Sequence, residues 1–201
     1  MKFPTLAVIA LGAATLSACT TPVGPVQVTR FVAADARAKL AVGTVSVISA
    51  PGLGDQPLQL QSYKAAVARE LVRLGYSEVG TDAGSQIAEV RVERFTEREG
   101  GRRSPVTVGA GGSTGSYGSG IGLGVGINLG GGSGVKTATE MGVVIRDRTT
   151  GDSIWEGRAS FVVDQKSPLA GTDLGAAAMA EALFADFPGN DGETVRVEVA
   201  D

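Results

Sequence analysis

The sequence predicts an α+β fold, with an antiparallel sheet, two helices on one face and a long Gly-rich hairpin excursion. Three observations support this prediction. Several segments alternate apolar and polar residues as strands do, and two segments repeat apolar residues at three- and four-residue steps as helices do. Consecutive strands are joined by short turns. Two helices are too few to cover both faces of a sheet, so we expect both on the same face.

The first nineteen residues have the form of a bacterial lipoprotein signal. Lys2 provides a positive charge, and the apolar run from Leu6 to Leu11 is too short to span a bilayer. The run leads to Leu16-Ser17-Ala18-Cys19, which resembles the lipobox cleaved by signal peptidase II. By that resemblance, residues 1–18 are the signal peptide and Cys19 is the lipidated first residue of the mature chain. The alternative is an ordinary secretory signal with an incidental cysteine.

The region after the signal is expected to tether the domain to a membrane. Several acyl chains, such as palmitate and diacylglyceryl, anchor a protein stably where one chain does not. Thr20 rather than Asp follows Cys19, which by analogy with enterobacterial sorting favours the outer membrane, with the domain facing the periplasm. Pro and Gly residues with no periodic apolar face follow. We therefore assign residues 19–30 to the lipidated cysteine and tether, and 31–201 to a single α+β domain.

The composition excludes several classes of function. There is no histidine, which removes the commonest general base and transition-metal ligand. Cys19 is the only cysteine, so no disulfide framework is expected within the chain. Lys and Arg number 18 against 21 Asp and Glu, without a basic block, which argues against a nucleic-acid partner. We expect no catalytic residue, no metal and no cofactor.

The first half of the domain predicts a strand, a helix and a second strand. Residues Gly43 to Ser49 alternate as a strand, and a turn-rich break with two Pro and two Gly residues follows. A helix is then marked by Leu60, Tyr63, Val67, Leu71 and Leu74, with Gly75 at the position of a C-terminal cap. From Gln86 to Arg98, apolar and charged residues alternate as in a half-buried strand.

The second half predicts a hairpin, a helix and an edge strand. One strand has Thr137 to Ile145 on alternate positions of its inner face, and the next has Trp155 to Val163. The short connection Asp147 to Asp152 contains Gly151, which favours an antiparallel hairpin. A helix from Thr172 to Asp186 is expected to be capped by Thr172 or Asp173. The chain closes with Glu193 to Val199, which alternates valine with charge as an edge strand does.

Between the two halves lies the Gly-rich arm, residues 104–135. Its glycines lack the G-x-G-x-x-G spacing of dinucleotide sites and the Gly-Lys-Ser/Thr of phosphate loops. They are also too dense for a helix, since each costs about 1 kcal/mol relative to alanine. Extended structure remains, with one apolar row made by Ile121, Leu123, Val125, Ile127 and Leu129. This row either rests on its own domain or forms an interaction arm that pairs with another copy, a partner strand or the membrane surface.

Two further features have both a catalytic or binding interpretation and a structural one. Asp147, Asp152 and Glu156 cluster around a tight turn and could imitate a catalytic carboxylate pair, but turn acids are usually local hydrogen-bond acceptors. Trp155 lies on the apolar side of its strand, which favours a core position over a ligand-stacking one.

The order of these motifs resembles that of bacterial envelope lipoproteins with the domain of unknown function 4136. The matching stretches are Thr139 to Ile145 followed by Trp155-Glu156-Gly157, the helix Ser62 to Val79, and Leu183 to Gly189. The stretch Ser104 to Gly126 resembles the Gly-rich arm that many members insert at this place. The resemblance implies a periplasm-facing α+β lipoprotein with no assigned reaction, so it implies no catalytic residues.

Taken together, these features predict a membrane-anchored periplasmic lipoprotein that acts as a binding or envelope-structural module. Its expected partners are the membrane, through the lipid anchor, and an envelope protein or a second copy. The alternative is self-assembly or partner pairing through the Gly-rich arm, and a less favoured alternative is a carboxylate-dependent hydrolase.

Overall fold

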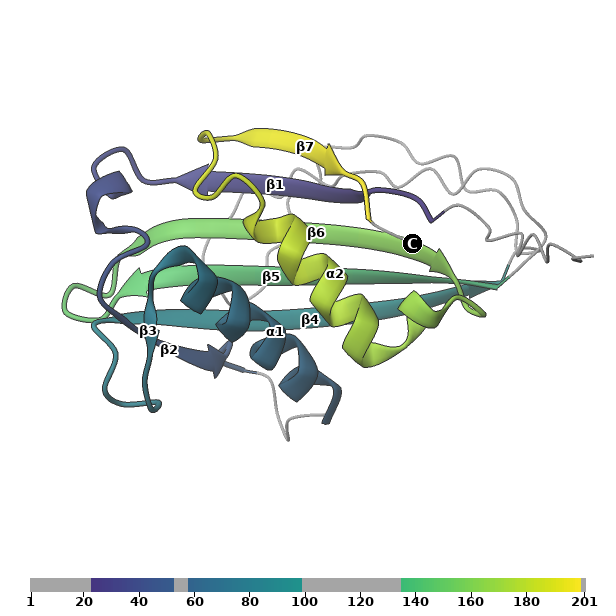
Figure 1. Cartoon of the computed structure of the whole chain (residues 1–201), viewed down its shortest axis with the longest axis horizontal. Helices are drawn as coiled ribbons and strands as arrows, with labels where there is room; N and C mark the ends of the chain where they lie inside the picture. The colour runs from purple at the N-terminus through teal and green to yellow at the C-terminus, as the bar shows by residue number, and fades with distance from the viewer. Residues whose placement is uncertain (1–22, 53–57, 99–134, 200–201) are drawn as a thin grey trace, which may run out of the picture.

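A computed structural model describes residues 23–52, 58–98 and 135–199, and Figure 1 shows their arrangement. Seven strands and two α-helices make up most of this part of the chain. In chain order they are β1 (Val26–Val32), β2 (Thr44–Ser49), α1 (Leu58–Leu74), β3 (Ser77–Glu78), β4 (Gln86–Arg98), β5 (Val135–Asp147), β6 (Ser153–Asp164), α2 (Thr172–Phe184) and β7 (Glu193–Val197), with short 3-10 turns η1 (Arg37–Lys39) and η2 (Pro168–Ala170).

The strands form one mixed sheet in the order β3-β2-β4-β5-β6-β1-β7. Most neighbours are antiparallel, but β2 runs parallel to both β3 and β4. The α+β class is confirmed, and the expectation of a purely antiparallel sheet is wrong at this edge. The reason is that α1 carries the chain back along the sheet after β2, so that β4 starts at the same end as β2.

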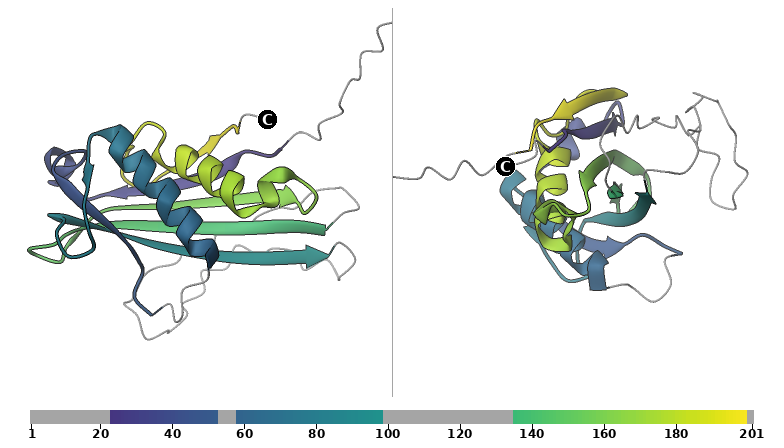
Figure 2. Two further views of the ribbon diagram at one scale, coloured as in Figure 1. Left: turned by 60° about the horizontal axis from the view of Figure 1, so that its bottom comes forward. Right: turned by 90° about the vertical axis from the view of Figure 1, so that its right-hand side faces the viewer.

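Both helices lie on the same face of the sheet, as expected, and Figure 2 shows this layer from two directions. We call this face the helix face and the opposite one the open face. The core lies between the helices and the sheet, because the strand residues of one parity are buried there. Its largest buried side chains include Trp155, Tyr63, Phe184, Leu71, Met141, Ile145, Met179 and Leu183.

The predicted elements are largely confirmed. The hairpin of β5 and β6 is closed by hydrogen bonds from the Asp147 amide to Asp152 O, 3.0 Å, and from the Gly151 amide to Asp147 O, 2.8 Å. Gly75 ends α1 with φ 114°, which a residue with a side chain rarely adopts. One detail is wrong: Gly171 precedes α2 as its N-cap residue, and no side chain caps this helix.

Two strands were missed. β1 begins at Val26, inside the stretch assigned to the tether, and lies between β6 and β7. Its core positions are Val26, Val28 and Val32, but Arg30 interrupts their apolar pattern. β3 has only two residues, too few to give a pattern in the sequence.

Among the residues that the structure describes, none of the helices combines the length and the apolar composition needed to cross a bilayer.

Candidate interaction surface

The open face of the sheet is lined by charged side chains that pair across or along its strands. Arg146 Nε lies 3.1 Å from Glu89 Oε2, joining β5 to β4. Arg158 NH2 lies 2.6 Å from Glu156 Oε1 on the same strand, β6. These side chains are partly exposed to water, so each ion pair contributes about 0–1 kcal/mol. Their main effect is to keep a large uncovered sheet face polar.

Apolar side chains also reach the open face, and they gather at one end of the central strands. Phe95 on β4 is 48% exposed, and its cross-strand neighbour on β5 is Ala138, which in turn faces Val162 on β6. Phe31 on β1 is 37% exposed on the same face but lies apart from this group, because it faces Glu156 near the other end of β6. Exposed aromatic side chains of this kind are enriched at protein interfaces. The end of the open face near Phe95 is therefore the part best suited to bind another surface.

Two polar side chains on this face have atoms that are buried but unpaired. Gln27 on β1 and Ser160 on β6 are direct cross-strand neighbours. Gln27 Oε1 and Ser160 Oγ are both shielded from solvent, and neither has a hydrogen-bond partner in the part of the chain that the structure describes. Leaving a buried polar atom unpaired costs about 1–3 kcal/mol. A hydrogen-bond donor supplied at this point would lower that cost.

The tether and the Gly-rich arm leave the sheet at the same end. β4 ends at Arg98, which faces Val135 at the start of β5. β1 starts at Val26, and its ladder with β6 begins at the pair Gln27 and Ser160, close to the end of β6 that faces the start of β5. Figure 1 shows these strand ends on the same side of the domain. The central hairpin extends beyond β1 at this end.

The predicted site residues of the N-terminus and arm lie outside the described residues. These are the lipidation candidate Cys19 and the row Ile121, Leu123, Val125, Ile127 and Leu129. The structure fixes only where the arm is attached, at Arg98 and Val135, which are paired residues of neighbouring antiparallel strands. The arm is thus an insertion at the tip of a hairpin.

The three turn acids do not form a common site. Asp147 Oδ1 accepts hydrogen bonds from the Thr149 and Thr150 amides, and its Oδ2 accepts from Lys39 Nζ at 3.2 Å. The Lys39 hydrogen bond, followed by those amides, lowers the pKa of Asp147. Glu156 instead pairs with Arg158. Asp147 is therefore a local acceptor, as predicted. In the described ranges, no three Asp, Glu, Cys or His side chains gather as they would around a metal ion.

Trp155 is a core residue, as predicted, and it belongs to an aromatic cluster on the helix face. It is 1% exposed, stacks on Phe184 with ring centres 5.3 Å apart, and contacts Phe187 at 5.1 Å. Its indole Nε1 donates to Pro188 O at 3.0 Å. A buried indole with its N–H satisfied has a structural role and is not available for ligand stacking.

Beside this cluster lies a buried arginine that sequence reasoning missed. Arg30 is 1% exposed, and its guanidinium donates to the carbonyls of Ala182, Leu183 and Ala185 at the C-terminus of α2. Its NH1 lies 2.9 Å from Glu193 Oε1 on β7. This Arg30 hydrogen bond lowers the pKa of Glu193. The available signal was a single charge on the apolar parity of β1, within V-x-V-x-R-x-V.

A third carboxyl group with a shifted pKa, Glu70, lies on α1. Burial raises the pKa of Glu70, and Glu181 on α2 adds to the rise. Arg73 NH2, 2.5 Å from Glu70 Oε2, opposes it. Glu70 is not among the residues that line the depression between α1 and β3.

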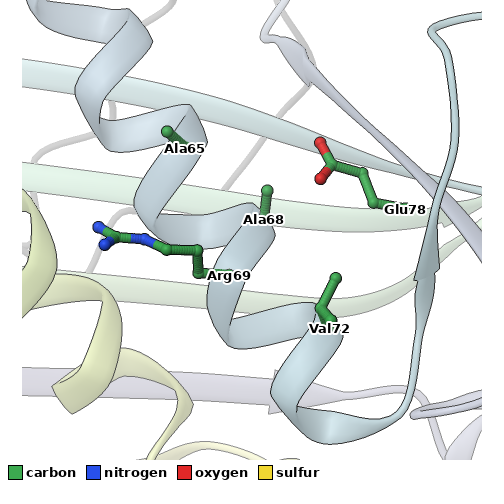
Figure 3. A pocket seen from close by; sticks show the side chains of 5 residues that line it. All are labelled: Ala65, Ala68, Arg69, Val72 and Glu78. Carbon is green, nitrogen blue, oxygen red and sulfur yellow. The ribbon is translucent and has the colours of Figure 1, made fainter.

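A shallow depression lies between α1 and β3 and is shown in Figure 3. The side chains of Ala65, Ala68 and Val72 form its floor, and Glu78 reaches over it from β3. Arg69 lines its far side. The depression is open to solvent and holds no cluster of acid, base and nucleophile, so its geometry supports contact with another surface better than catalysis.

Comparisons with known proteins give no family. No protein-family model matches the sequence, and no curated protein matches it. Among solved structures, a PelC dodecamer from Paraburkholderia phytofirmans is 11% identical with a TM-score of 0.48, covering 83% of this chain and 99% of that one. A variant of the same protein is 12% identical with a TM-score of 0.46, covering 80% of this chain and 95% of that one. A PDZ domain protein from Parabacteroides distasonis is 12% identical with a TM-score of 0.49, covering 87% of this chain and 39% of that one. Likenesses at this level establish neither family nor function.

Proposed function

We propose that this protein is a lipid-anchored envelope lipoprotein whose α+β domain faces the periplasm and binds an envelope protein through its open face. Cys19 carries the acyl chains and holds the domain at the outer membrane. The domain performs no chemistry of its own. This assignment follows the resemblance to lipoproteins of the domain of unknown function 4136, and the fold is compatible with it.

The position of β1 supports a domain held close to the membrane. β1 begins at Val26, seven residues after Cys19. Seven extended residues span at most about 25 Å. The anchor therefore restrains the end of the sheet that carries Phe95 and the arm attachment. A partner met at that end would be a protein of the same envelope compartment.

The observation that carries the proposal is the uncovered sheet face. Seven strands bury one face under α1 and α2, while the other presents partly exposed ion pairs, Phe95 and Phe31, and two unpaired polar atoms. Such a mixture of aromatic, charged and unsatisfied polar groups is typical of surfaces that bind proteins. A partner would cover the aromatic rings and offer hydrogen-bond donors to Gln27 and Ser160.

A second candidate function is partner pairing or self-assembly through the Gly-rich arm. It is favoured by the attachment of the arm to two paired residues, Arg98 and Val135, at the tip of the central hairpin. The sequence predicts an extended, uncharged aliphatic row in this arm, and the edge of an extended segment can pair with another chain. Deleting Pro105 to Gly134 tests it, because oligomers or captured partners that persist without the arm would exclude this candidate.

Site-specific photocrosslinking in cells tests the proposed binding face. A photoreactive residue at Phe95 is expected to give adducts with an envelope protein, whereas one at Leu174, which is 58% exposed on α2, is expected to give none. Adducts at Leu174 but not at Phe95 would place the binding face elsewhere. In parallel, labelling with a palmitate analogue is expected to be lost in Cys19→Ala. A labelled Cys19→Ala protein would refute the anchor.

A further inference from the structure

The last strand of the sheet, β7, is an edge, and its last three residues together with the two residues that follow it form a sequence that is complementary to itself. β7 is at the end of the strand order and pairs only with β1 in the part of the chain that the structure describes. Alternate amides and carbonyls of such a strand point away from the sheet and can pair with another strand. The residues from Val195 to Val199 read Val-Arg-Val-Glu-Val. When two copies of this segment run antiparallel and are centred on Val197, each valine faces a valine and Arg196 faces Glu198.

The two sides of this segment match that symmetry. Val195, Val197 and Val199 are half-buried and pack against the core on the helix face. Arg196 and Glu198 alternate with them and are exposed. Neither of these two makes an ion pair or a side-chain hydrogen bond within the described residues. The edge therefore presents an incompletely covered apolar row and two unused opposite charges.

We propose that the segment Val195 to Val199, which is the end of β7 and the two residues after it, pairs antiparallel with the same segment of a second copy of this chain, around a two-fold axis at Val197. In this register Arg196 of each copy faces Glu198 of the other, and Val195 faces Val199. Opposite charges directly across an antiparallel pair each contribute about 0.2–1 kcal/mol. A register centred on Val195 would instead place Val197 against Glu193 and Arg196 against Thr194. The charges thus select one register, and the two sheets become continuous.

The opposite edge of the sheet lacks these features. β3 consists of Ser77 and Glu78 only, and it presents no alternating apolar row. A two-residue edge provides too few hydrogen bonds to hold a second sheet. The exposed carboxylate of Glu78 has no cationic counterpart on the same strand. The edge at β7 is therefore the one suited to a second copy, and β3 provides a matched control.

The dimer extends the proposed function without depending on the identity of the envelope partner. Val197 faces Val26, the first residue of β1, so the axis passes close to the point where each tether begins. Two anchors in one membrane would raise the effective concentration of the second strand. A five-residue pairing that is weak in dilute solution would then form at the membrane surface.

Charge reversal tests the pairing on the full-length chain in detergent, with the dimer followed by sedimentation over a dilution series. Arg196→Glu or Glu198→Arg alone is expected to weaken the dimer about tenfold, because each places two like-charged pairs across the axis. The double reversal is expected to restore it to within about threefold. Glu78→Arg on β3 is the matched control and should leave the dimer unchanged. Two single reversals without effect, or a double reversal that fails to restore, would overturn the proposal.

A cysteine at the axis provides a second test that does not depend on charge. Val197→Cys in the membrane-bound full-length chain is expected to give a disulfide-linked species of twice the mass, because only this register places residue 197 against itself. The parent chain, with Cys19 alone, gives the background, and Glu78→Cys is the control. Crosslinking to a different protein, or none above background, would overturn the proposal. The Phe95 and palmitate experiments would stand in either case.

Discussion

The two faces of the sheet handle arginine in opposite ways. On the helix face, Arg30 is 1% exposed and its guanidinium bonds to three carbonyls of α2 and to Glu193. On the open face, the Arg158 side chain is 48% exposed and pairs with Glu156, two residues away on its own strand. The first arginine joins distant elements, and the second bonds locally. The buried arginine therefore holds elements of the fold together, whereas the exposed one keeps its face of the sheet polar.

The largest expected contrast is between aromatic residues on the two faces. Trp155→Ala removes a buried ring that stacks on Phe184 and bonds to Pro188 O, so we expect a loss of about 3–5 kcal/mol in the free energy of unfolding. Phe95→Ala on the open face should change it by about 0.5 kcal/mol or less. Urea denaturation of both variants measures the contrast. Equal losses would mean that the open face is part of the core.

The next contrast concerns the two arginines. Arg30→Met leaves three carbonyls at the end of α2, and Glu193, without their donor, and leaving buried acceptors unpaired costs about 1–3 kcal/mol in the free energy of unfolding. Arg158→Met should cost about 1 kcal/mol or less, because its pair is exposed. Arg30→Lys keeps the charge but cannot serve all four acceptors, so it should recover only part of the loss. Full stability in Arg30→Lys would show that charge alone suffices.

A glycine from each face provides a smaller contrast. A Cβ added to Gly157 would collide with the indole of Trp155 and approach Leu183 Cδ1 to 2.8 Å, so Gly157→Ala should cost about 1–3 kcal/mol. On the open face, a Cβ on Gly142 would come no closer than 3.9 Å, to Arg91 NH2. Gly142→Ala should be neutral or raise the free energy of unfolding by about 0.5–1 kcal/mol. Thermal unfolding of the pair distinguishes a packed glycine from an unpacked one.

The smallest effect is the pH dependence that Glu193 confers. Arg30 lowers the pKa of Glu193, so the folded state binds fewer protons than the unfolded state below the ordinary glutamate pKa. Its stabilising contribution is complete above that value and is lost as the pH falls through the lowered pKa. Glu193→Gln should flatten the fall in stability below about pH 4.5. An unchanged acid profile in denaturation experiments would separate Glu193 from the Arg30 interaction.

Much of the fold was predictable because, in most strands, apolar residues at every second position mark the face that is buried. From Thr137 to Ile145 in β5 and from Trp155 to Val163 in β6, every second residue is buried and none of these residues is charged, so the hairpin and the core position of Trp155 were both predicted correctly. β1 was missed because Arg30 occupies a core position that the pattern treats as exposed. The parallel pairing of β2 was missed because it depends on the path of α1 and not on the residues of the strand itself.

The site was less predictable than the fold. The open face is the one that neither α1 nor α2 covers, which depends on how these described helices pack on the sheet and not on any one segment of the sequence. The unpaired atoms of Gln27 and Ser160 depend on the pairing of β1 with β6, two strands separated by most of the chain. By contrast, the self-complementary stretch around Val197 can be recognised in the sequence alone, and the structure adds that it lies at an edge of the sheet.

The place of β1 in the sheet has a mechanical consequence. A pull applied at Val26 is directed along the strand, at right angles to the hydrogen bonds that join β1 to β6 and to β7. Both ladders are then loaded in shear, and all their bonds share the force. Arg30, on the same strand, also joins it to α2 through a hydrogen bond to Leu183 O. Under the proposed anchoring at Cys19, tension would reach the domain through this strand, and the two ladders would not break one hydrogen bond at a time.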